Sequence, residues 1–219
     1  MSNPITRSLL MATAMANAPA FFHRLFRQDW YGGTLKNWVN GLALDPRANI
    51  LELGCGPGNL SVWLAQNGYS VTGADKSDSM IRRAARFKSA AKFIQADAFD
   101  LPMGNAEFDV VLLSSLINIV PDRPKLLAEA GRVLRPGGTI SALFPTPEFT
   151  ITRADEISTK LRLNHLSSAA ISLWASAPPN LEPPEISREL IAAGFENPHT
   201  TLHLENSIAS VTARKISAS

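Results

Sequence analysis

A glycine-rich turn directly after a short apolar run is the strongest candidate for chemistry in the sequence. Gly54, Gly56 and Gly58 are spaced as G-x-G-x-G after the run 51–53, and Asn59 opens a helix-like segment. Glycines let a backbone approach a ligand closely and adopt positive φ, and a helix start presents unpaired N–H groups. The pattern favours a ligand site at the end of a buried strand. A ligand-free tight turn is the alternative interpretation of such a turn taken alone.

The spacing of this turn separates it from the nicotinamide-binding fingerprint, which reads G-x-G-x-x-G. Pro57 also removes a backbone donor that a pyrophosphate would need, so a ligand without phosphates fits better. Asp75 follows about twenty residues after Gly54, at the expected end of a second strand, where a carboxylate accepts hydrogen bonds from ribose hydroxyls. We therefore predict a nucleoside ligand. A solvated strand-end acid is the alternative for Asp75 alone.

A third element follows the next strand and reads Gln95-Ala96-Asp97-Ala98. The Asp97 carboxylate can accept from an exocyclic amine, and the N–H of Ala98 can donate to a ring nitrogen, which together recognise adenine. A loop aspartate that caps its own turn is the alternative for Asp97 alone. All three elements lie at the carboxyl ends of adjacent strands near a topological switch point, where open α/β sheets bind ligands.

The elements that position these residues alternate between strand-like and helix-like patterns. We predict an α/β fold with a Rossmann-like, doubly wound and mostly parallel seven-stranded sheet. The predicted strands of the parallel part are Ala48–Leu53, Ser70–Ala74, Lys92–Gln95, Phe108–Leu113 and Thr139–Phe144. The predicted helices between them are Asn59–Gln66, Asp78–Phe87 and Asp122–Leu134.

The remainder of the chain predicts an insertion and an antiparallel edge. Six prolines between 145 and 184 surround a helical stretch from Ala154 to about His165. A helix over Glu185–Ala193 ends at Gly194, and the segments 200–205 and 208–215 form a C-terminal edge hairpin. We predict a single domain over 1–219, with an N-terminal helical lid (1–45), a cofactor-binding core (46–144), a substrate-side insertion (145–184) and a C-terminal helix and hairpin (185–219).

With these motifs the sequence resembles the class I S-adenosylmethionine-dependent methyltransferases, in particular the small-molecule group (methyltransferase type 11) that includes the ubiquinone and menaquinone biosynthesis enzymes. The resemblance covers about 48–144. The matching motifs are Glu52–Gly58, Asp75, Ala96–Ala98, Phe108-Asp109-Val110-Val111 and Leu134-Arg135-Pro136-Gly137-Gly138.

The resemblance implies S-adenosylmethionine as cofactor and S-adenosylhomocysteine as product. It places the glycine loop at the methionine part of the cofactor, Asp75 at the ribose, and Lys76 and Asp97 at the adenine. Glu52 would contact the amino group of the methionine, and Ser115 would face the methyl group. The implied cofactor-binding residues are Glu52, Gly54, Cys55, Gly56, Gly58, Asp75, Lys76, Asp97, Ala98 and Ser114.

The sequence indicates less about the methyl acceptor than about the cofactor. The segment 115–119 lacks the histidine pair of many relatives, and no Asp/Asn-Pro-Pro-Tyr tetrapeptide follows the fourth strand, which disfavours methylation of nucleic-acid bases. The candidate bases are His23, Tyr31, Glu148 and His165, each more often structural or solvated, so no catalytic residue is assigned.

An aromatic-rich stretch from Phe21 to Tyr31, together with Trp174, is predicted to cover the site. Apolar walls favour a hydrophobic or aromatic acceptor. The alternative is that these rings only pack a helix onto the sheet.

Composition limits the partners. The 219 residues carry 21 Lys and Arg against 19 Asp and Glu, which predicts no basic stripe for nucleic acid. The single cysteine, Cys55, excludes an internal disulfide or a multi-thiolate metal site and favours a reducing, cytoplasmic compartment. We predict no metal and no membrane span. Residues 8–18 read as an amphipathic helix or, alternatively, as part of a signal peptide.

Two other functions remain open at the level of sequence. A non-catalytic protein that binds the cofactor as a sensor or partner subunit has the same motifs, because no catalytic side chain is required to define them. An NAD-dependent oxidoreductase shares the glycine turn and the acid that follows the second strand. The G-x-G-x-G spacing and Asp97 argue against that oxidoreductase.

Overall fold

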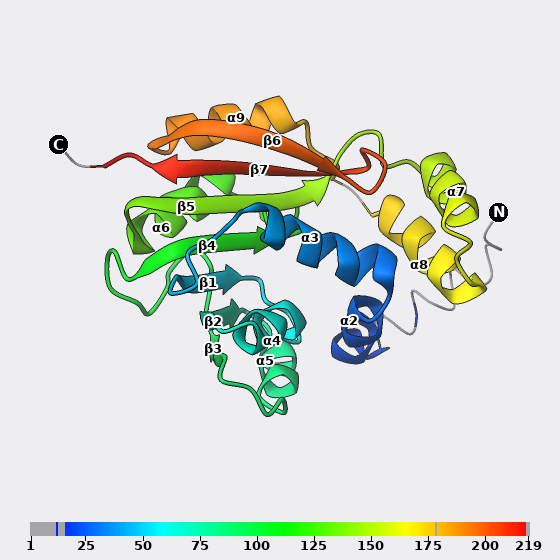
Figure 1. Ribbon diagram of the computed structural model, residues 1–219, viewed down its shortest axis with the longest axis horizontal. Helices are drawn as coiled ribbons and strands as arrows, with labels where there is room; N and C mark the ends of the chain where they lie inside the picture. Colours follow the sequence, from blue (N-terminus) through cyan, green and yellow to red (C-terminus); the bar gives the residue numbers. More distant parts are fainter. Residues whose placement is uncertain (1–11, 13–15, 178, 218–219) are drawn as a thin grey trace.

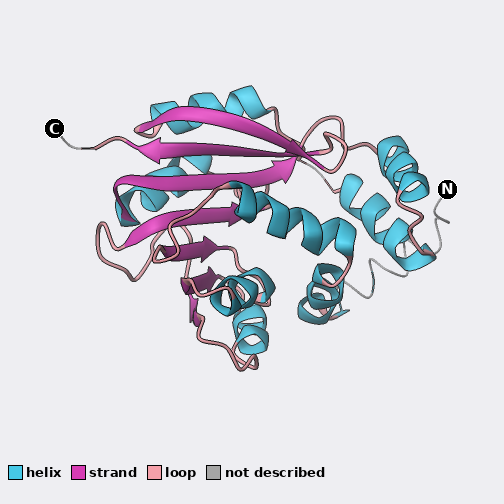
Figure 2. Cartoon of the chain, viewed as in Figure 1, coloured by secondary structure: helices cyan, strands magenta, loops and turns pink. Residues whose placement is uncertain are grey.

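A seven-stranded mixed sheet organises the chain, with strand order β3-β2-β1-β4-β5-β7-β6 (Figures 1 and 2). The computed structural model describes residues 12, 16–177 and 179–217. The five strands from β3 to β5 pair in parallel, and β7 and β6 complete the sheet antiparallel. The predicted Rossmann-like sheet with an antiparallel C-terminal edge is thereby confirmed. The strands are β1 (Asn49–Leu53), β2 (Ser70–Asp75), β3 (Lys92–Gln95), β4 (Phe108–Ser114), β5 (Leu134–Pro145), β6 (Phe195–His203) and β7 (Ile208–Lys215).

Helices cover both faces of this sheet. Side chains of α6 and α9 contribute to one apolar core, and side chains of α3, α4, α7 and α8 contribute to the other. In Figure 1, α3 crosses in front of the sheet and α6 lies behind it. The helices are α2 (Ala18–Phe26), the π-helix η1 (Asp29–Gly33), α3 (Thr34–Gly41), α4 (Asn59–Gln66), α5 (Asp78–Ala84), α6 (Arg123–Val133), α7 (Ile151–Lys160), α8 (His165–Ala175) and α9 (Pro183–Ala192).

The two cores follow from the alternation of side chains along each strand. In β4, Val111 and Leu113 belong to the core under α6, whereas Val110 and Leu112 belong to the core on the opposite face. All four are almost completely buried. A strand that buries both faces reads as a continuous apolar run, which is why the central strands are recognisable from the sequence.

Local cap chemistry fixes the ends of several helices. Ser77 caps α5 by accepting from the Met80 N–H at 3.4 Å, and Asp122 caps α6 by accepting from the Lys125 N–H at 2.9 Å. Toward the C-terminus, Gly194 adopts φ +87° just after α9. Ser77 and Asp122 satisfy orphan N–H groups, and Gly194 ends α9 in the left-handed region, as predicted for Gly194.

Three predicted boundaries are wrong. The single helix over 154–165 is two helices, because Arg162 takes a positive φ and Asn164 caps α8 by accepting from the Ser167 N–H at 2.9 Å. The helix predicted to run to Phe87 ends at Ala84. The fifth strand begins at Leu134 rather than Thr139, since Leu134 already pairs with Phe108 before a register shift.

The terminal hairpin also differs from its prediction. Strand β6 begins at Phe195 instead of Thr200 and contains a register shift between Glu196 and His199. The turn spans 204–207, rather than Asn206-Ser207 alone, because Leu204 and the two residues after it take positive φ.

The N-terminal helices differ in what they contact. In α3, Trp38 is 1% exposed and its Nε1–H donates to Ser141 Oγ on β5 at 2.9 Å, so α3 is anchored to the sheet. Helix α2 lies beyond the strand ends instead (Figure 1). The segment 8–18, interpreted above as amphipathic helix or signal peptide, lies outside the described residues except for 12 and 16–18. Within the described part of the chain, we find no helix with the length and apolarity needed to cross a membrane.

Candidate functional site

A cavity of about 700 Å³ opens at the carboxyl ends of β1, β2, β3 and β4. Helices α2 and α8 close it on the side toward which the strand arrowheads point (Figure 1). Its wall includes every predicted cofactor-binding residue except Gly58. The predicted residues that line it are Glu52, Gly54, Cys55, Gly56, Asp75, Lys76, Asp97, Ala98, Ser114 and Ser115.

The glycine loop owes its shape to backbone that only glycine adopts easily. Gly54, Gly56 and Gly58 have φ of +71°, +54° and +78°. A Cβ on Gly56 would meet no atom within 4 Å, so the loop leaves open space at this position on the cavity wall. A Cβ on Gly58 would lie 2.7 Å from the Phe93 ring. Gly58 is therefore required for packing, whereas Gly56 leaves room for a ligand.

Asp75 connects the glycine loop to the end of β2. One carboxylate oxygen accepts from the Gly56 N–H at 2.8 Å, and the other accepts from the Ser77 N–H at 2.8 Å. Each oxygen retains a second lone pair. The Asp75 carboxylate can therefore accept hydrogen bonds from a bound ligand while it holds the loop in place.

Glu52 is a buried acid beneath the loop. It is 2% exposed, and the Ser61 hydroxyl donates to its Oε2. Burial raises the pKa of Glu52 to about 7, and the negative charge of Asp75 adds to this effect. The protonated and the ionised forms of Glu52 are therefore both accessible near neutral pH. Burial also raises the pKa of the Cys55 thiol, so this cysteine is not a nucleophile.

The loop after β3 carries the third predicted element. Lys76 Nζ donates to Asp97 Oδ2 at 2.9 Å, and the Phe99 N–H donates to Asp97 Oδ1 at 3.0 Å. The hydrogen bond from Lys76 lowers the pKa of Asp97, which stays ionised. The pair is largely exposed, so it contributes little to stability. Both side chains lie on the cavity wall.

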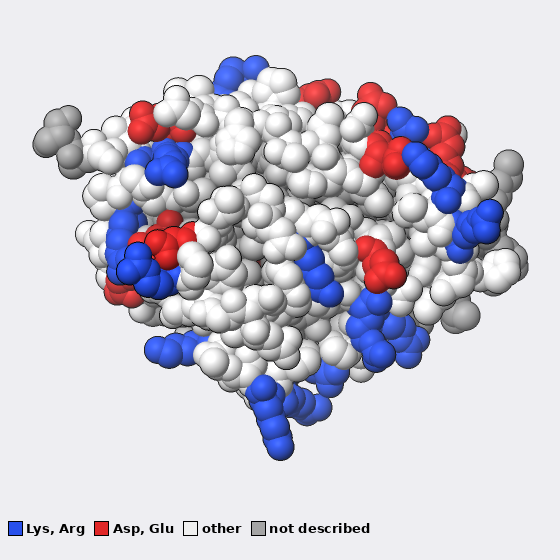
Figure 3. Space-filling view, in the orientation of Figure 1, with Lys and Arg blue, Asp and Glu red and all other residues white. Residues whose placement is uncertain are grey.

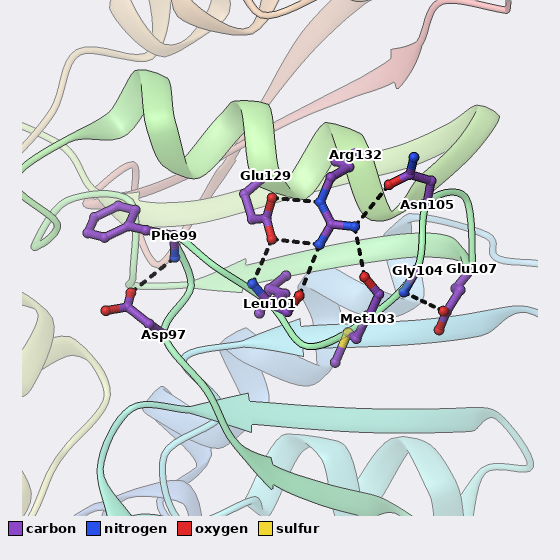
Figure 4. A network of polar contacts seen from close by, with 9 residues as sticks. All are labelled: Asp97, Phe99, Leu101, Met103, Gly104, Asn105, Glu107, Glu129 and Arg132. Atoms are coloured by element: carbon purple, nitrogen blue, oxygen red, sulfur yellow. Dashed lines mark hydrogen bonds and ion pairs between the residues drawn. The ribbon is translucent and has the colours of Figure 1, made fainter.

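An ion pair on α6 holds this loop in place, as Figure 4 shows. Glu129 accepts from the Leu101 N–H at 2.6 Å, and Arg132 donates to the carbonyls of Leu101 and Met103 at 3.1 and 2.8 Å. Arg132 also lowers the pKa of Glu129. Sequence reasoning missed both residues. A Glu and an Arg three residues apart on a helix read as a surface pair, and only the tertiary structure brings the loop backbone to them.

Aromatic side chains form the opposite wall of the cavity. Phe21, Phe22 and Phe26 come from α2, Tyr31 from η1 and Trp174 from α8. The Tyr31 and Trp174 rings meet edge to face with centroids 5.2 Å apart. Trp30 is 4% exposed and packs beneath this wall without lining it.

Of the four candidate bases, Tyr31 alone lines the cavity. Burial and the negative charge of Glu52 raise the pKa of Tyr31, so its hydroxyl stays protonated. His23 bonds to the Asn59 side chain at 2.7 Å and does not reach the cavity wall. Glu148 and His165 are exposed outside the cavity.

Sequence reasoning did not single out Asn118, which lies on the cavity wall just after β4 and is 5% exposed. Its neighbours in the sequence are isoleucines, and nothing in the sequence pattern alone distinguishes a buried amide from an exposed one.

Comparison with known proteins shows which families the chain resembles. Residues 51–142 match the family described as "Methyltransferase domain". The malonyl-(acyl-carrier protein) O-methyltransferase of Enterobacter lignolyticus is 34% identical over 110 residues, which are 50% of this chain and 41% of that protein. The demethylmenaquinone methyltransferase of Clavibacter sepedonicus is 41% identical over 109 residues, 48% of this chain and 44% of that protein. The matches thus span less than half the length of these curated relatives.

Solved structures share the fold over more of the chain. A SAM-dependent methyltransferase from Aquifex aeolicus superposes with a TM-score of 0.68 at 15% identity, covering 90% of this chain and 98% of that one. The 4+2 cyclase SpnF superposes with a TM-score of 0.58 at 17% identity, covering 80% of this chain and 77% of that one. The family model and the curated relatives thus confirm the resemblance to methyltransferases, whereas these solved structures show the fold alone, which does not specify a reaction.

Proposed function

We propose that this chain, which carries a methyltransferase domain of the S-adenosylmethionine-dependent class over residues 51–142, transfers a methyl group to a small hydrophobic or aromatic acceptor. The observation that carries the proposal is that the glycine loop, Asp75, Asp97 and the aromatic residues of α2 and α8 line one cavity. One wall of that cavity suits a nucleoside, and the opposite wall suits an apolar molecule.

The residues present fit S-adenosylmethionine. Gly56 leaves open space on the wall, and Asp75 offers free lone pairs to ribose hydroxyls. Asp97 and the N–H of Ala98 would recognise the adenine edge, with Lys76 beside it. Glu52 and Ser114 would lie at the methionine part. When bound, the cofactor supplies a methyl group that a positively charged sulfur has already activated.

The carboxylates favour a cationic ligand at this end of the cavity. Glu52 and Asp75 lie close enough for the charge of Asp75 to raise the pKa of Glu52. A ligand ammonium beside them would reverse that shift and ionise Glu52, because an opposite charge favours the charged form. The carboxylates of Glu52 and Asp75 would then stabilise the ligand-bound state more than the free protein.

The chain's contribution to the reaction is positioning and exclusion of water. Because the methyl donor is activated, the protein has mainly to hold the acceptor in line with it. The apolar wall formed by Phe21, Tyr31 and Trp174 would orient the acceptor and keep water out. Tyr31 is not a general base, since its hydroxyl remains protonated.

We propose a cytoplasmic location and no nucleic-acid partner on the grounds of charge and cysteine content. Lys and Arg exceed Asp and Glu by only two, and Cys55 is the only cysteine in the sequence. On the face seen in Figure 3, acidic and basic side chains are interspersed over most of the surface, and those at the lower edge are basic. An electrophoretic shift assay with duplex DNA and single-stranded RNA at 150 mM salt tests for nucleic-acid binding. A shift would contradict the proposal that the chain has no nucleic-acid partner.

Formation of S-adenosylhomocysteine tests the proposed activity. The protein is incubated with S-adenosylmethionine and a panel of phenols, aromatic amines and small apolar acids, and the product is quantified by chromatography. We expect acceptor-dependent product from the native chain and none from Gly56→Val. Tight cofactor binding without product from any acceptor would instead support the non-catalytic alternative.

A further inference from the structure

Asn118 lies in a fixed turn at the carboxyl end of β4. The turn begins at Ser115, which takes φ +52° and whose N–H donates to the Leu143 carbonyl at 2.8 Å. It closes where the Ile119 N–H donates to the Leu116 carbonyl at 3.0 Å. Asn118 is 5% exposed, whereas Ile119 next to it is 64% exposed. The turn therefore buries a polar residue and exposes an apolar one, although both line the cavity, which reverses the usual order of burial.

The Asn118 amide is left incomplete. Its Nδ2 donates to the Pro179 carbonyl at 3.5 Å, the outer limit of a hydrogen bond. Its Oδ1 is buried and accepts no hydrogen bond from any described residue. A buried carbonyl without a donor destabilises a fold, so such groups are normally completed by a bound partner. Because Asn118 is among the residues that line the cavity and its contact with Pro179 is weak, a small rotation of the amide would let a ligand supply the missing donor.

The charges on the cavity wall define which ligand that is. Among the described lining residues, the charged ones are Glu52, Asp75, Lys76 and Asp97. All four belong to the end that the proposed function gives to the cofactor. Around Asn118 and the aromatic residues, the described wall is apolar or uncharged. A charged acceptor bound there would lose its water without gaining an opposite charge.

We propose that Asn118 positions the methyl acceptor, and that the acceptor is an uncharged apolar molecule whose hydroxyl or N–H donates to Asn118 Oδ1. This inference rests on the proposed function, because it gives the remaining part of the cavity to the acceptor. An amide cannot remove a proton at neutral pH, so Asn118 is a positioning residue and not a base. It selects by hydrogen bonding, while the aromatic wall selects by shape.

Three probes with one ring system test the selection in the native chain. Binding of 2-naphthol, naphthalene and 2-naphthoate is measured by ligand-observed NMR in the presence of saturating S-adenosylhomocysteine. We expect 2-naphthol to bind about tenfold more tightly than naphthalene, the effect of one hydrogen bond to a buried group. The carboxylate 2-naphthoate should bind most weakly of the three.

Asn118→Leu removes the polar atom and keeps a similar volume. We expect its preference for 2-naphthol over naphthalene to fall to within about twofold, with S-adenosylhomocysteine affinity unchanged within about twofold. Its melting temperature should equal or exceed that of the native chain, because an unsatisfied buried carbonyl is removed. An asparagine that served the fold would instead lower the melting temperature on replacement.

Asn180→Leu is the matched control. Asn180 also has a buried Oδ1 without a partner among the described residues, but it does not line the cavity. We expect this variant to keep the tenfold preference for 2-naphthol.

The inference is overturned if native protein binds 2-naphthol no better than naphthalene, if 2-naphthol does not bind at all, or if Asn118→Leu keeps the preference. The native comparison requires no variant, so a folding failure of Asn118→Leu leaves the test intact. Titration of S-adenosylhomocysteine in the same samples separates the two proposals. Loss of that binding contradicts the proposed function, whereas cofactor binding without probe selection contradicts only the role of Asn118.

Discussion

The two walls of the cavity are built in different ways. The wall at the carboxyl ends of β1, β2 and β3 consists of backbone and polar side chains that are adjacent in the sequence, such as Gly54–Pro57 and Asp75-Lys76. The opposite wall consists of large side chains from α2, η1 and α8, brought together across most of the chain. The first wall depends on turn geometry and charge, and the second on apolar packing. Substitutions in the first wall should therefore lower ligand affinity, whereas substitutions in the second should lower the stability of the fold.

The largest expected effect is loss of cofactor binding in Gly56→Val. Valine is strained at φ +54° and its branched side chain would occupy the open space of the loop. We expect S-adenosylmethionine affinity to fall more than about 100-fold by calorimetric titration, with the far-ultraviolet circular dichroism unchanged.

Gly68→Val is the matched control, because Gly68 also takes a positive φ with open space around its Cβ position but lies away from the cavity. It should carry a similar backbone cost and keep normal cofactor affinity. A folded Gly56→Val protein with native affinity would remove the glycine loop from the binding site.

A substitution in the aromatic wall should lower the stability of the fold and leave cofactor affinity nearly unchanged. Trp174 packs against the rings of Tyr31 and Phe149, each with centroids 5.2 Å away. Trp174→Ala should lower the free energy of unfolding by about 2–3 kcal/mol. Urea denaturation measures this loss, and calorimetry should find S-adenosylmethionine affinity within about threefold of native. A large loss of cofactor affinity without a change in stability would show that the two walls are not separate.

Asp75→Ala removes the carboxylate that holds the loop and faces the cavity. We expect it to weaken S-adenosylmethionine binding by about 1–3 kcal/mol, since buried hydroxyls and the Gly56 N–H lose a charged acceptor. Asp109→Ala is the control, because Asp109 begins β4 at the opposite edge of the sheet and pairs with Arg135. Native affinity in folded Asp75→Ala would mean that Asp75 is not a cofactor ligand.

The smallest effect expected is a pH dependence that Glu52 confers. Since burial raises its pKa from 4.5 to about 7, the folded protein holds a proton that the unfolded chain releases at lower pH. The contribution of Glu52 to stability therefore falls as pH rises from about 4.5 through 7. Cofactor affinity should change in the opposite direction, rising by up to about tenfold between pH 6 and 8 as the ionised carboxylate becomes available.

Both slopes are measurable, by urea denaturation and by titration with S-adenosylhomocysteine at several pH values. Glu52→Gln, which cannot ionise, should flatten both. Slopes that persist in Glu52→Gln would assign the pH dependence to another group.

The sequence predicts the first wall well because its determinants are local. Gly54, Gly56, Asp75 and Asp97 each follow a strand-like run, and parallel strands bring their carboxyl ends to one edge. Gly58 follows the same pattern but serves packing against Phe93, a contact that spacing cannot reveal.

Contacts between distant segments and the chain's C-terminal edge are harder to predict. Glu129 and Arg132 hold the loop after β3, and Asn118 contacts Pro179, through residues that are distant in sequence. Strand β6 contains Pro198 and polar residues before Thr200, which read as a loop, yet an edge strand tolerates proline and a register shift.

Binding of S-adenosylmethionine by the glycine-loop wall is tested by calorimetric titration of the native chain with S-adenosylmethionine, S-adenosylhomocysteine and NAD in parallel. We expect micromolar binding of the first two and none of NAD, because Pro57 and the G-x-G-x-G spacing leave no pyrophosphate site. Binding of NAD, or failure of both S-adenosyl compounds to bind, would contradict it.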